Sequence, residues 1–363
     1  MVSLLLTGAV IILLSTSVSI ALPHLQRPDN LFSVTIAQDT RHHPEVQILL
    51  RRWHISSAVI GLVVAGVCMI TFLFSPSSLS FMLPVFVLVY SIMISISYMA
   101  FHRQAFAFGL PAEGNTTRVA SLRPRSSGTL IFSWWELVPL SVIVLTAILL
   151  AMRYPTAPSA IPLHFDPAGH ATRFATKSPW TFFSLIGVQL SVWAILTVLG
   201  AGVSMARVAP STAAAGEAYR RMWVRLILVM KTGTMTLLSI SYLLTTSHSS
   251  SGTLVGPMAV LPIVLNVTLL TLMLVLVLRY GQSGWRLLRR TGSQLTTHGD
   301  ATPDGAWKGG LFYYNPNDPA LFVEKRSGPG WTMNFGHSRA LLVLIGLLLG
   351  SLLLNLLPVL FQH

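Results

Sequence analysis

Long apolar stretches alternate with short polar connections along the whole chain. A helix needs about 20 mostly apolar residues to cross the hydrocarbon core of a bilayer, and eight stretches reach that length. Backbone groups in lipid must be paired within the protein, and the stretches lack the period-two alternation of barrel strands, so they predict helices. The predicted spans are Val2–Leu22, His54–Ser75, Ser80–Phe101, Leu130–Met152, Trp180–Ser204, Leu226–Thr246, Leu254–Tyr280 and Ser338–Phe361. The sequence therefore predicts an all-α integral membrane protein with about eight transmembrane helices.

The connections divide this prediction into three parts. Residues 1–280 form a seven-helix membrane region that includes an outside loop at 153–179. Residues 281–337 form a cytoplasmic loop, and residues 338–363 form the last helix with a short outside tail. In the cytoplasmic loop, two strand-like segments, 310–314 and 320–325, flank a turn of Asn and Pro residues, which predicts a small β-hairpin. Amphipathic segments near Pro44–Arg52 and Ser211–Arg225 predict short interfacial helices before the second and sixth spans.

The amino-acid composition also indicates an integral membrane protein. The chain is 53% hydrophobic and 10% charged, and its mean hydropathy is +0.67, so it has too little polar surface for a soluble globule of this length. Its formal net charge of +13 would indicate nucleic acid in a soluble protein, but here the basic residues lie in short runs between the spans. We therefore expect the lipid bilayer, and no nucleic acid, as a partner.

The distribution of the basic residues predicts the orientation. Twenty of the 24 Lys and Arg residues lie in the odd-numbered connections or at the last membrane edge, whereas Arg153, Arg173 and Lys177 lie in the others. The positive-inside rule places the odd-numbered loops in the cytoplasm and both termini outside. We expect the first helix to be retained, because a cleaved signal peptide in the usual orientation would invert this pattern.

The outside loop at 153–179 is the most informative connection. Its prolines and glycine favour a fixed, extended conformation with a turn. His164, Asp166 and His170 carry donor types suitable for zinc, although His164 could equally hydrogen-bond the loop onto the helices. With Arg173 and Lys177 they form the predicted ligand-binding set.

Two opposite charges, Glu136 and Lys231, fall within predicted spans at similar depths. They could pair with each other in the bundle, serve an ion or proton relay, or reach separately toward the interface. A pair or separate snorkelling would be structural, whereas a relay would indicate a transporter.

Enzyme activity and cofactor binding have little support. The chain has no HExxH, GxSxG, Walker-type or GxGxxG motif, which would carry metalloprotease, hydrolase, nucleotide or dinucleotide chemistry. Its single cysteine, Cys68, can form neither an intramolecular disulfide nor a thiolate metal cluster by itself. We expect a protein that is not an enzyme and has no cofactor.

Two motifs carry a family resemblance. The stretch from Ile161-Pro162-Leu163-His164 to Gly169 resembles the IPxHxxxxG loop of a bacterial domain of unknown function, DUF1648, which is shared with SdpI-type immunity proteins. The stretch with Phe312-Tyr313-Tyr314-Asn315-Pro316 and Gly330-Trp331-Thr332 is similar to a second such domain, DUF5808. The resemblance implies a bacterial cytoplasmic-membrane protein and, by analogy with the SdpI type, protection against a peptide toxin or signalling to a regulator.

The leading hypothesis is a bacterial membrane protein whose outside loop binds or senses an extracellular ligand, such as a peptide, with a cytoplasmic regulator as a further partner. A small-solute or ion transporter using Glu136 and Lys231 is the first alternative. A metal-dependent membrane enzyme using His164, Asp166 and His170 is the second.

Overall fold

The computed structural model describes residues 2–75, 78–110, 134–165, 171–206, 213–247, 255–286, 300 and 302–360. It is mostly helical, at 74%, and divides into two compact units that are described one at a time. The first contains Met1–Leu122, Ala206–Glu217 and Val277–Ser338, and the second contains Arg123–Met205, Ala218–Leu276 and Arg339–His363. The division after residues 280 and 337 that the sequence predicted stays a prediction.

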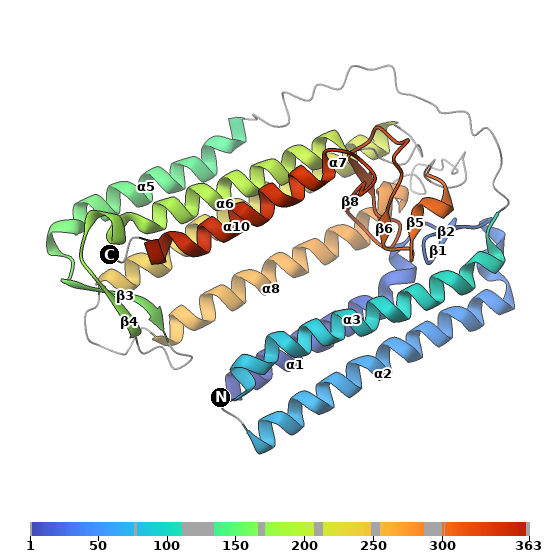
Figure 1. Cartoon of the computed structure of the whole chain (residues 1–363), viewed down its shortest axis with the longest axis horizontal. Helices are drawn as coiled ribbons and strands as arrows, with labels where there is room; N and C mark the ends of the chain where they lie inside the picture. Colours follow the sequence, from blue (N-terminus) through green and yellow to red (C-terminus); the bar gives the residue numbers. More distant parts are fainter. Residues whose placement is uncertain are drawn as a thin grey trace. The chain divides into compact units, whose positions relative to one another are not determined.

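Each predicted span corresponds to a helix in the described residues (Figure 1). The long helices are α1 (Val2–Leu25), α2 (Pro44–Phe74), α3 (Leu79–Ala105), α5 (Leu137–Arg153), α6 (Pro179–Met205), α7 (Ala213–Ser247), α8 (Val255–Tyr280) and α10 (Ala340–Leu360). Six of them belong to segments long and apolar enough to cross a membrane, and α8 and α10 contain shorter apolar stretches, Val267–Tyr280 and Ala340–Gly350. The predicted fold class, a multi-pass helical membrane protein, is confirmed.

Short elements connect the helices. The 3-10 helices are η1 (Asp39–His42), η3 (Phe106–Phe108), η4 (Trp134–Glu136), η5 (Tyr154–Thr156), η7 (Gln282–Gly284) and η8 (Asp304–Ala306). The strands are β1 (Asn30–Leu31), β2 (Val34–Thr35), β3 (Ala160–Phe165), β4 (Ala171–Thr176), β5 (Trp307–Lys308), β6 (Phe312–Tyr313), β7 (Phe322–Glu324) and β8 (Trp331–Met333). They form four antiparallel pairs, β1–β2, β3–β4, β5–β6 and β7–β8.

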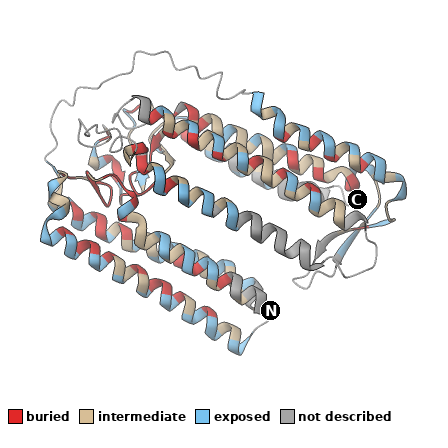
Figure 2. Cartoon of the chain, turned by 180° about the vertical axis from the view of Figure 1, so that it is seen from behind, coloured by how far each residue is buried: buried red, intermediate tan, exposed pale blue. Residues whose placement is uncertain are grey.

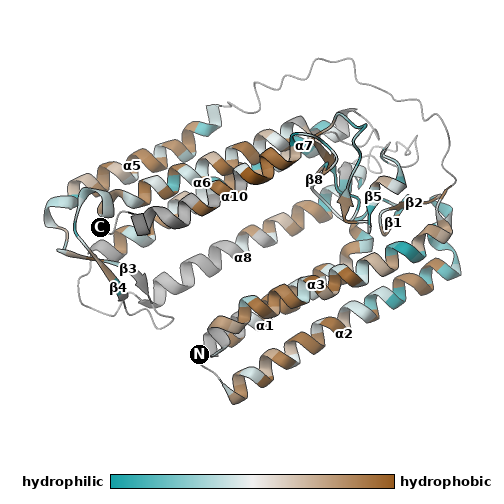
Figure 3. Ribbon diagram, viewed as in Figure 1, coloured by the Kyte–Doolittle hydropathy of each residue, from teal (hydrophilic) through white to brown (hydrophobic). Residues whose placement is uncertain are grey.

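In the first unit, α1, α2 and α3 pack against one another and bury an aromatic cluster at one end. The ring centre of Phe32, which lies between β1 and β2, is 5.4 Å from those of Trp53 and Phe101 and 5.7 Å from that of Tyr98. Buried positions form stripes along these helices (Figure 2), while the remaining faces are also hydrophobic (Figure 3). Exposed apolar faces of this kind suit contact with lipid.

The helix α2 differs from its predicted form in one respect. It begins at Pro44, with proline in the first turn, so the amphipathic segment and the second span are one continuous helix. Val46, Leu49 and Trp53 on its buried face pack into the same aromatic cluster. The same is true of α7, which runs without a break from Ala213.

The first unit also contains a lobe formed by residues 300 and 302–338. The predicted strands are present, but they do not pair with each other as expected. β6 pairs with β5, and β7 pairs with β8. The physical reason lies in Gly309 and Gly310, whose φ angles of +60° and +73° turn the chain back between β5 and β6, a conformation that glycine adopts without strain.

In the second unit, α5 and α10 both contact α6, and polar side chains link α5, α6 and α7. The hydroxyls of Thr146 and Ser239 lie 2.6 Å apart. The amide of Gln189 donates to the Ser239 hydroxyl at 2.8 Å and to the carbonyl of Met235 at 3.1 Å. Hydrogen bonds of this kind hold helices together where lipid offers no hydrophobic driving force.

Candidate functional site

The predicted ligand loop folds as a hairpin between α5 and α6. β3 and β4 pair antiparallel, with Ile161 opposite Ala175 and Pro162 opposite Phe174. Ile161 is fully buried and packs against Leu150 of α5 and Phe182 of α6. The base of the hairpin is therefore fixed to the helix ends by an apolar contact, and its strands have the extended conformation that the prolines predicted.

Lys177 reinforces this base. Its ammonium donates to the backbone oxygen of Ala157 at 2.9 Å and to that of Pro155 at 3.4 Å. It also lies 4.9 Å from the centre of the Tyr154 ring, within the range of a cation–π contact. The structure thus gives Lys177, a predicted ligand residue, a positioning role between the end of α5 and the end of β4.

The first turn of α6 is hydrogen-bonded to the end of β4. The Thr181 hydroxyl donates to the carbonyl of Thr176 at 2.9 Å, and the Thr181 amide donates to the Ser178 hydroxyl at 3.1 Å. From α7, the Tyr242 hydroxyl donates to the carbonyl of Phe182 at 2.8 Å. The first turn of α6 therefore holds the end of β4, and α7 contacts that turn of α6.

Beyond this base, two side chains of β4 are exposed among the described residues. Arg173 is exposed, and the side chain of Phe174 is 58% exposed. Consecutive strand residues point to opposite faces, so the two side chains reach both sides of the hairpin. The exposed ring of Phe174 is therefore placed to contact a ligand or the membrane interface.

The predicted metal set cannot be placed in the same way. Asp166 and His170 lie outside the described residues, as does the side chain of His164. Among the residues that the structure does describe, no group of three or more His, Cys, Asp or Glu side chains could hold a metal ion. The zinc alternative therefore stays a prediction.

Glu136 and Lys231 form an ion pair in the second unit. Lys231 of α7 donates to both carboxylate oxygens of Glu136 at 2.8 Å, and its third donor reaches the Thr197 hydroxyl of α6, also at 2.8 Å. The indole N–H of Trp193 donates to Glu136 at 3.1 Å. Lys231 is 1% exposed and Glu136 is 19% exposed.

All three ammonium donors of Lys231 are used in this arrangement. The contacts connect η4, α6 and α7 through one charge pair, which is the pairing that the sequence offered as a structural possibility. A buried pair needs such additional hydrogen bonds to offset desolvation. Thr197 and Trp193 are the partners that sequence reasoning missed, and their only signal was their polar atoms inside a predicted span.

A second polar cluster lies in the first unit and was not predicted. Arg326, which follows β7, donates to the Asp300 carboxylate, at 2.7 Å for the shortest contact, and also to Asp304. Its guanidinium further donates to the backbone oxygens of Ser33, at 3.0 Å, and Thr302. One side chain thus ties the lobe to the loop between α1 and α2.

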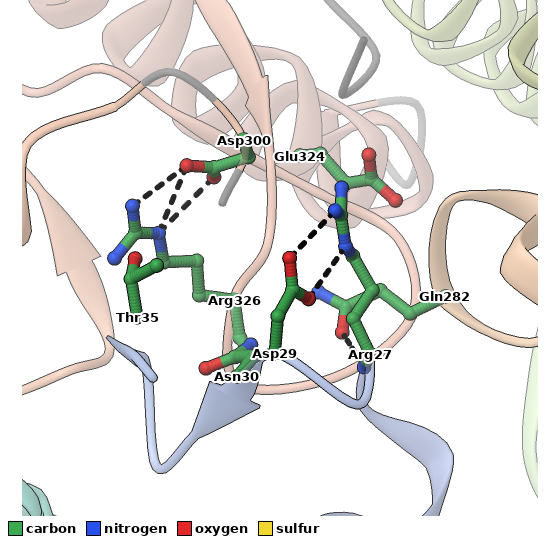
Figure 4. A pocket seen from close by; sticks show the side chains of 8 residues that line it. All are labelled: Arg27, Asp29, Asn30, Thr35, Gln282, Asp300, Glu324 and Arg326. Atoms are coloured by element: carbon green, nitrogen blue, oxygen red, sulfur yellow. Dashed lines mark hydrogen bonds and ion pairs between the residues drawn. The ribbon is translucent and has the colours of Figure 1, made fainter. Parts of the chain in front are cut away.

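Residues of that loop complete the cluster (Figure 4). Arg27 and Asp29 form an ion pair at 2.8 Å, and the Arg27 backbone amide donates to the side chain of Gln282 at 3.0 Å. The side-chain amide of Asn30 donates to the carbonyl of Arg326 at 2.6 Å. The basic and acidic side chains of this cluster are paired with one another, which indicates that the cluster stabilises the fold.

The charges of this network shift one another's ionisation. Burial by itself raises the pKa of Asp300, but the Arg326 guanidinium outweighs it, and the pKa lies below its usual value. Burial alone would lower the pKa of Arg326, yet Asp300 and Asp304 raise it. Burial lowers the pKa of Arg41, which Asp29 partly offsets. Both members of the Asp300–Arg326 pair therefore remain charged at neutral pH.

Comparison with known families agrees with the two motifs. Residues 142–190, which include the β3–β4 hairpin, match a domain of unknown function, DUF1648. Residues 316–341, which include β7 and β8, match a family of unknown function, DUF5808. The chain matches no curated protein and no solved structure. The resemblance predicted from the sequence is confirmed, and it indicates a membrane protein without indicating an activity.

Proposed function

We propose that this chain is a non-enzymatic protein of the bacterial cytoplasmic membrane that recognises an extracytoplasmic ligand through the β3–β4 hairpin. The observation that carries the proposal is the contrast within this hairpin. Ile161 is fully buried against the helix ends, whereas Phe174, on the partner strand, is 58% exposed. A rigid mount lowers the entropy lost on binding, and an exposed aromatic side chain supplies contact area.

The orientation rests on charge and on one contact. The positive-inside rule places the hairpin outside, because 20 of the 24 Lys and Arg residues lie in the odd-numbered connections or at the last membrane edge. The connections after the first and seventh spans, both predicted to be cytoplasmic, touch each other through the hydrogen bond from Asn30 to the carbonyl of Arg326. Segments in contact lie on the same side of the membrane, which supports the predicted alternation.

The transporter alternative receives less support. A relay needs a group that can exchange partners, whereas the ammonium of Lys231 has a protein acceptor for each of its donors. The pair is better explained as a clamp among helices.

The test uses cells that produce the intact protein, the Phe174→Ser variant or the Thr176→Ala variant, at matched membrane levels. Thr176 lies on the same strand and is exposed, and its contact with Thr181 involves only its backbone, so it is the matched control. The cells are challenged with secreted membrane-active peptides, and survival is scored. Protection by the intact and Thr176→Ala proteins, but not by Phe174→Ser, is the expected result. Equal survival of all strains, including one without the protein, would contradict the proposal.

A further inference from the structure

The hairpin on which the proposed function rests has unpaired strand edges. Among the described residues, β3 and β4 form a two-stranded sheet, so each strand has a neighbour on one side only. An unpaired edge presents a row of backbone N–H and C=O groups that can template another strand. The natural ligand of such an edge is an extended peptide.

The two edges are not equivalent. β3 contains Pro162, which has no N–H, and its register with β4 shifts between Pro162 and Phe165. β4 contains no proline from Ala171 to Thr176, and its pairing with β3 is regular from Phe174 to Thr176, although the second register shift skips Thr172. Proline and irregular pairing are the features that make an edge a poor template, so β4 is the better docking edge.

The hydrogen bonds show which backbone groups of β4 point outward. The amide of Lys177 donates to the carbonyl of Ser159 at 2.8 Å, so position 177 faces β3. In an antiparallel pair this direction alternates, and the backbone groups of Phe174 and Thr176 therefore face the open edge. The outward carbonyl of Thr176 is occupied by the Thr181 hydroxyl, which leaves Phe174 at the accessible part of the edge.

Charge narrows the ligand class. Residues 153–179 contain three basic residues, Arg153, Arg173 and Lys177, and a single acidic one, Asp166. An acidic segment would be attracted to this surface, and a basic one would be repelled. The exposed ring of Phe174 would in addition cover an apolar side chain of an added strand.

We propose that β4 is a docking edge for an extended, acidic peptide segment of a partner molecule, which adds to the hairpin as a third strand. The proposal deepens the proposed function by naming its ligand class and binding mode. Main-chain bonds to Phe174 would give affinity, and the basic residues of the connection would give selectivity.

The test measures binding of fluorescent decapeptides to the full-length protein in nanodiscs. The probes are (Val-Glu)5, its basic counterpart (Val-Lys)5, and a (Val-Glu)5 peptide with N-methyl groups on every residue, which cannot donate from either edge. We expect (Val-Glu)5 to bind, N-methylation to weaken binding about tenfold or more, and (Val-Lys)5 to bind poorly. The Arg173→Glu variant should reduce the preference for the acidic peptide, whereas Lys325→Ala in the lobe should leave it unchanged.

Two results would overturn the inference. One is equal affinity for the methylated and unmethylated peptides, and the other is failure of (Val-Glu)5 to bind at all. Loss of protection in Phe174→Ser cells together with equal binding of the two acidic peptides would leave hairpin recognition standing and remove strand addition. Binding that depends on N–H donors without any protection in cells would instead remove the proposed function.

Discussion

The ammonium of Lys231 lies 2.8 Å from both carboxylate oxygens of Glu136. The two residues are 95 positions apart in the chain and come from α7 and from η4, the turn before α5. Thr197 and Trp193 of α6 bond to the pair from a third helix. Each buried charge is thus compensated by the other. Removing one of them should lower the free energy of unfolding more than removing both.

We expect Lys231→Met to destabilise the protein by about 3–5 kcal/mol, because it leaves the Glu136 carboxylate buried without its counter-charge. The double variant Lys231→Met, Glu136→Gln should recover most of this loss. Thermal unfolding in detergent micelles measures both, with the exposed Arg225→Met on the same helix as the control. If the double variant is as unstable as the sum of the two single variants, the pair is not coupled.

Arg326→Ala should reverse the pH dependence of the lobe. In the intact protein, the lowered pKa of Asp300 contributes stability that is present above the usual carboxyl pKa of about 4 and is lost as the pH falls through the lowered value. Without Arg326, burial raises this pKa instead, so the variant should lose stability as the pH rises from about 4 to 7.

Thermal unfolding of the lobe between pH 3 and 7 measures this reversal. The neighbouring Lys325→Ala is the control, because Lys325 is exposed and its removal leaves the Asp300–Arg326 pair in place. Parallel pH profiles for Arg326→Ala and the intact protein would refute the prediction.

Gly310→Ala should destabilise the junction of the lobe and α3 by more than about 1 kcal/mol. The residue has a φ of +73°, and an added Cβ would lie 2.8 Å from Nδ1 of His102. Gly305→Ala is the matched control, because its Cβ would meet nothing within 4 Å. Limited proteolysis of the lobe in both variants is the measurement, and equal resistance would contradict the prediction.

A reporter that is active only in the cytoplasm should be active when fused after Arg290 and silent when fused after Lys177. The expectation follows from the bias of Lys and Arg toward the odd-numbered connections, of which the seventh is the most basic. Activity at the second position and silence at the first would reverse the orientation and would place the β3–β4 hairpin inside the cell.

Much of the fold follows directly from the sequence, because lipid leaves few choices. A stretch such as Trp180–Ser204 can only be a helix in a bilayer, and α6 covers Pro179–Met205. The contact of Glu136 with Lys231 was also foreseeable, since opposite charges inside spans tend to pair. The need to pair backbone groups and charges in lipid can be recognised in each segment on its own, which is why these features were predictable.

Strand pairing and long-range contacts were less predictable. The Gly309-Gly310 pair was a local turn signal that would have joined β5 to β6, but the Asn-Pro run after Tyr314 offered a competing turn. No spacing in the sequence relates Asn30 to Arg326, which lie 296 positions apart. The exposure of Phe174 likewise depends on which face of β4 packs on the helices, and the sequence alone does not specify this.

The hydrogen bonds from Asn30 and Thr35 to the lobe also constrain biosynthesis. The loop between α1 and α2 leaves the ribosome early, but its partners Asp304 and Arg326 are synthesised only after seven of the long helices. Until then the polar groups of the loop must be satisfied by water or by a chaperone. The loop between α1 and α2 therefore cannot complete its hydrogen bonds until nearly all of the protein has been translated.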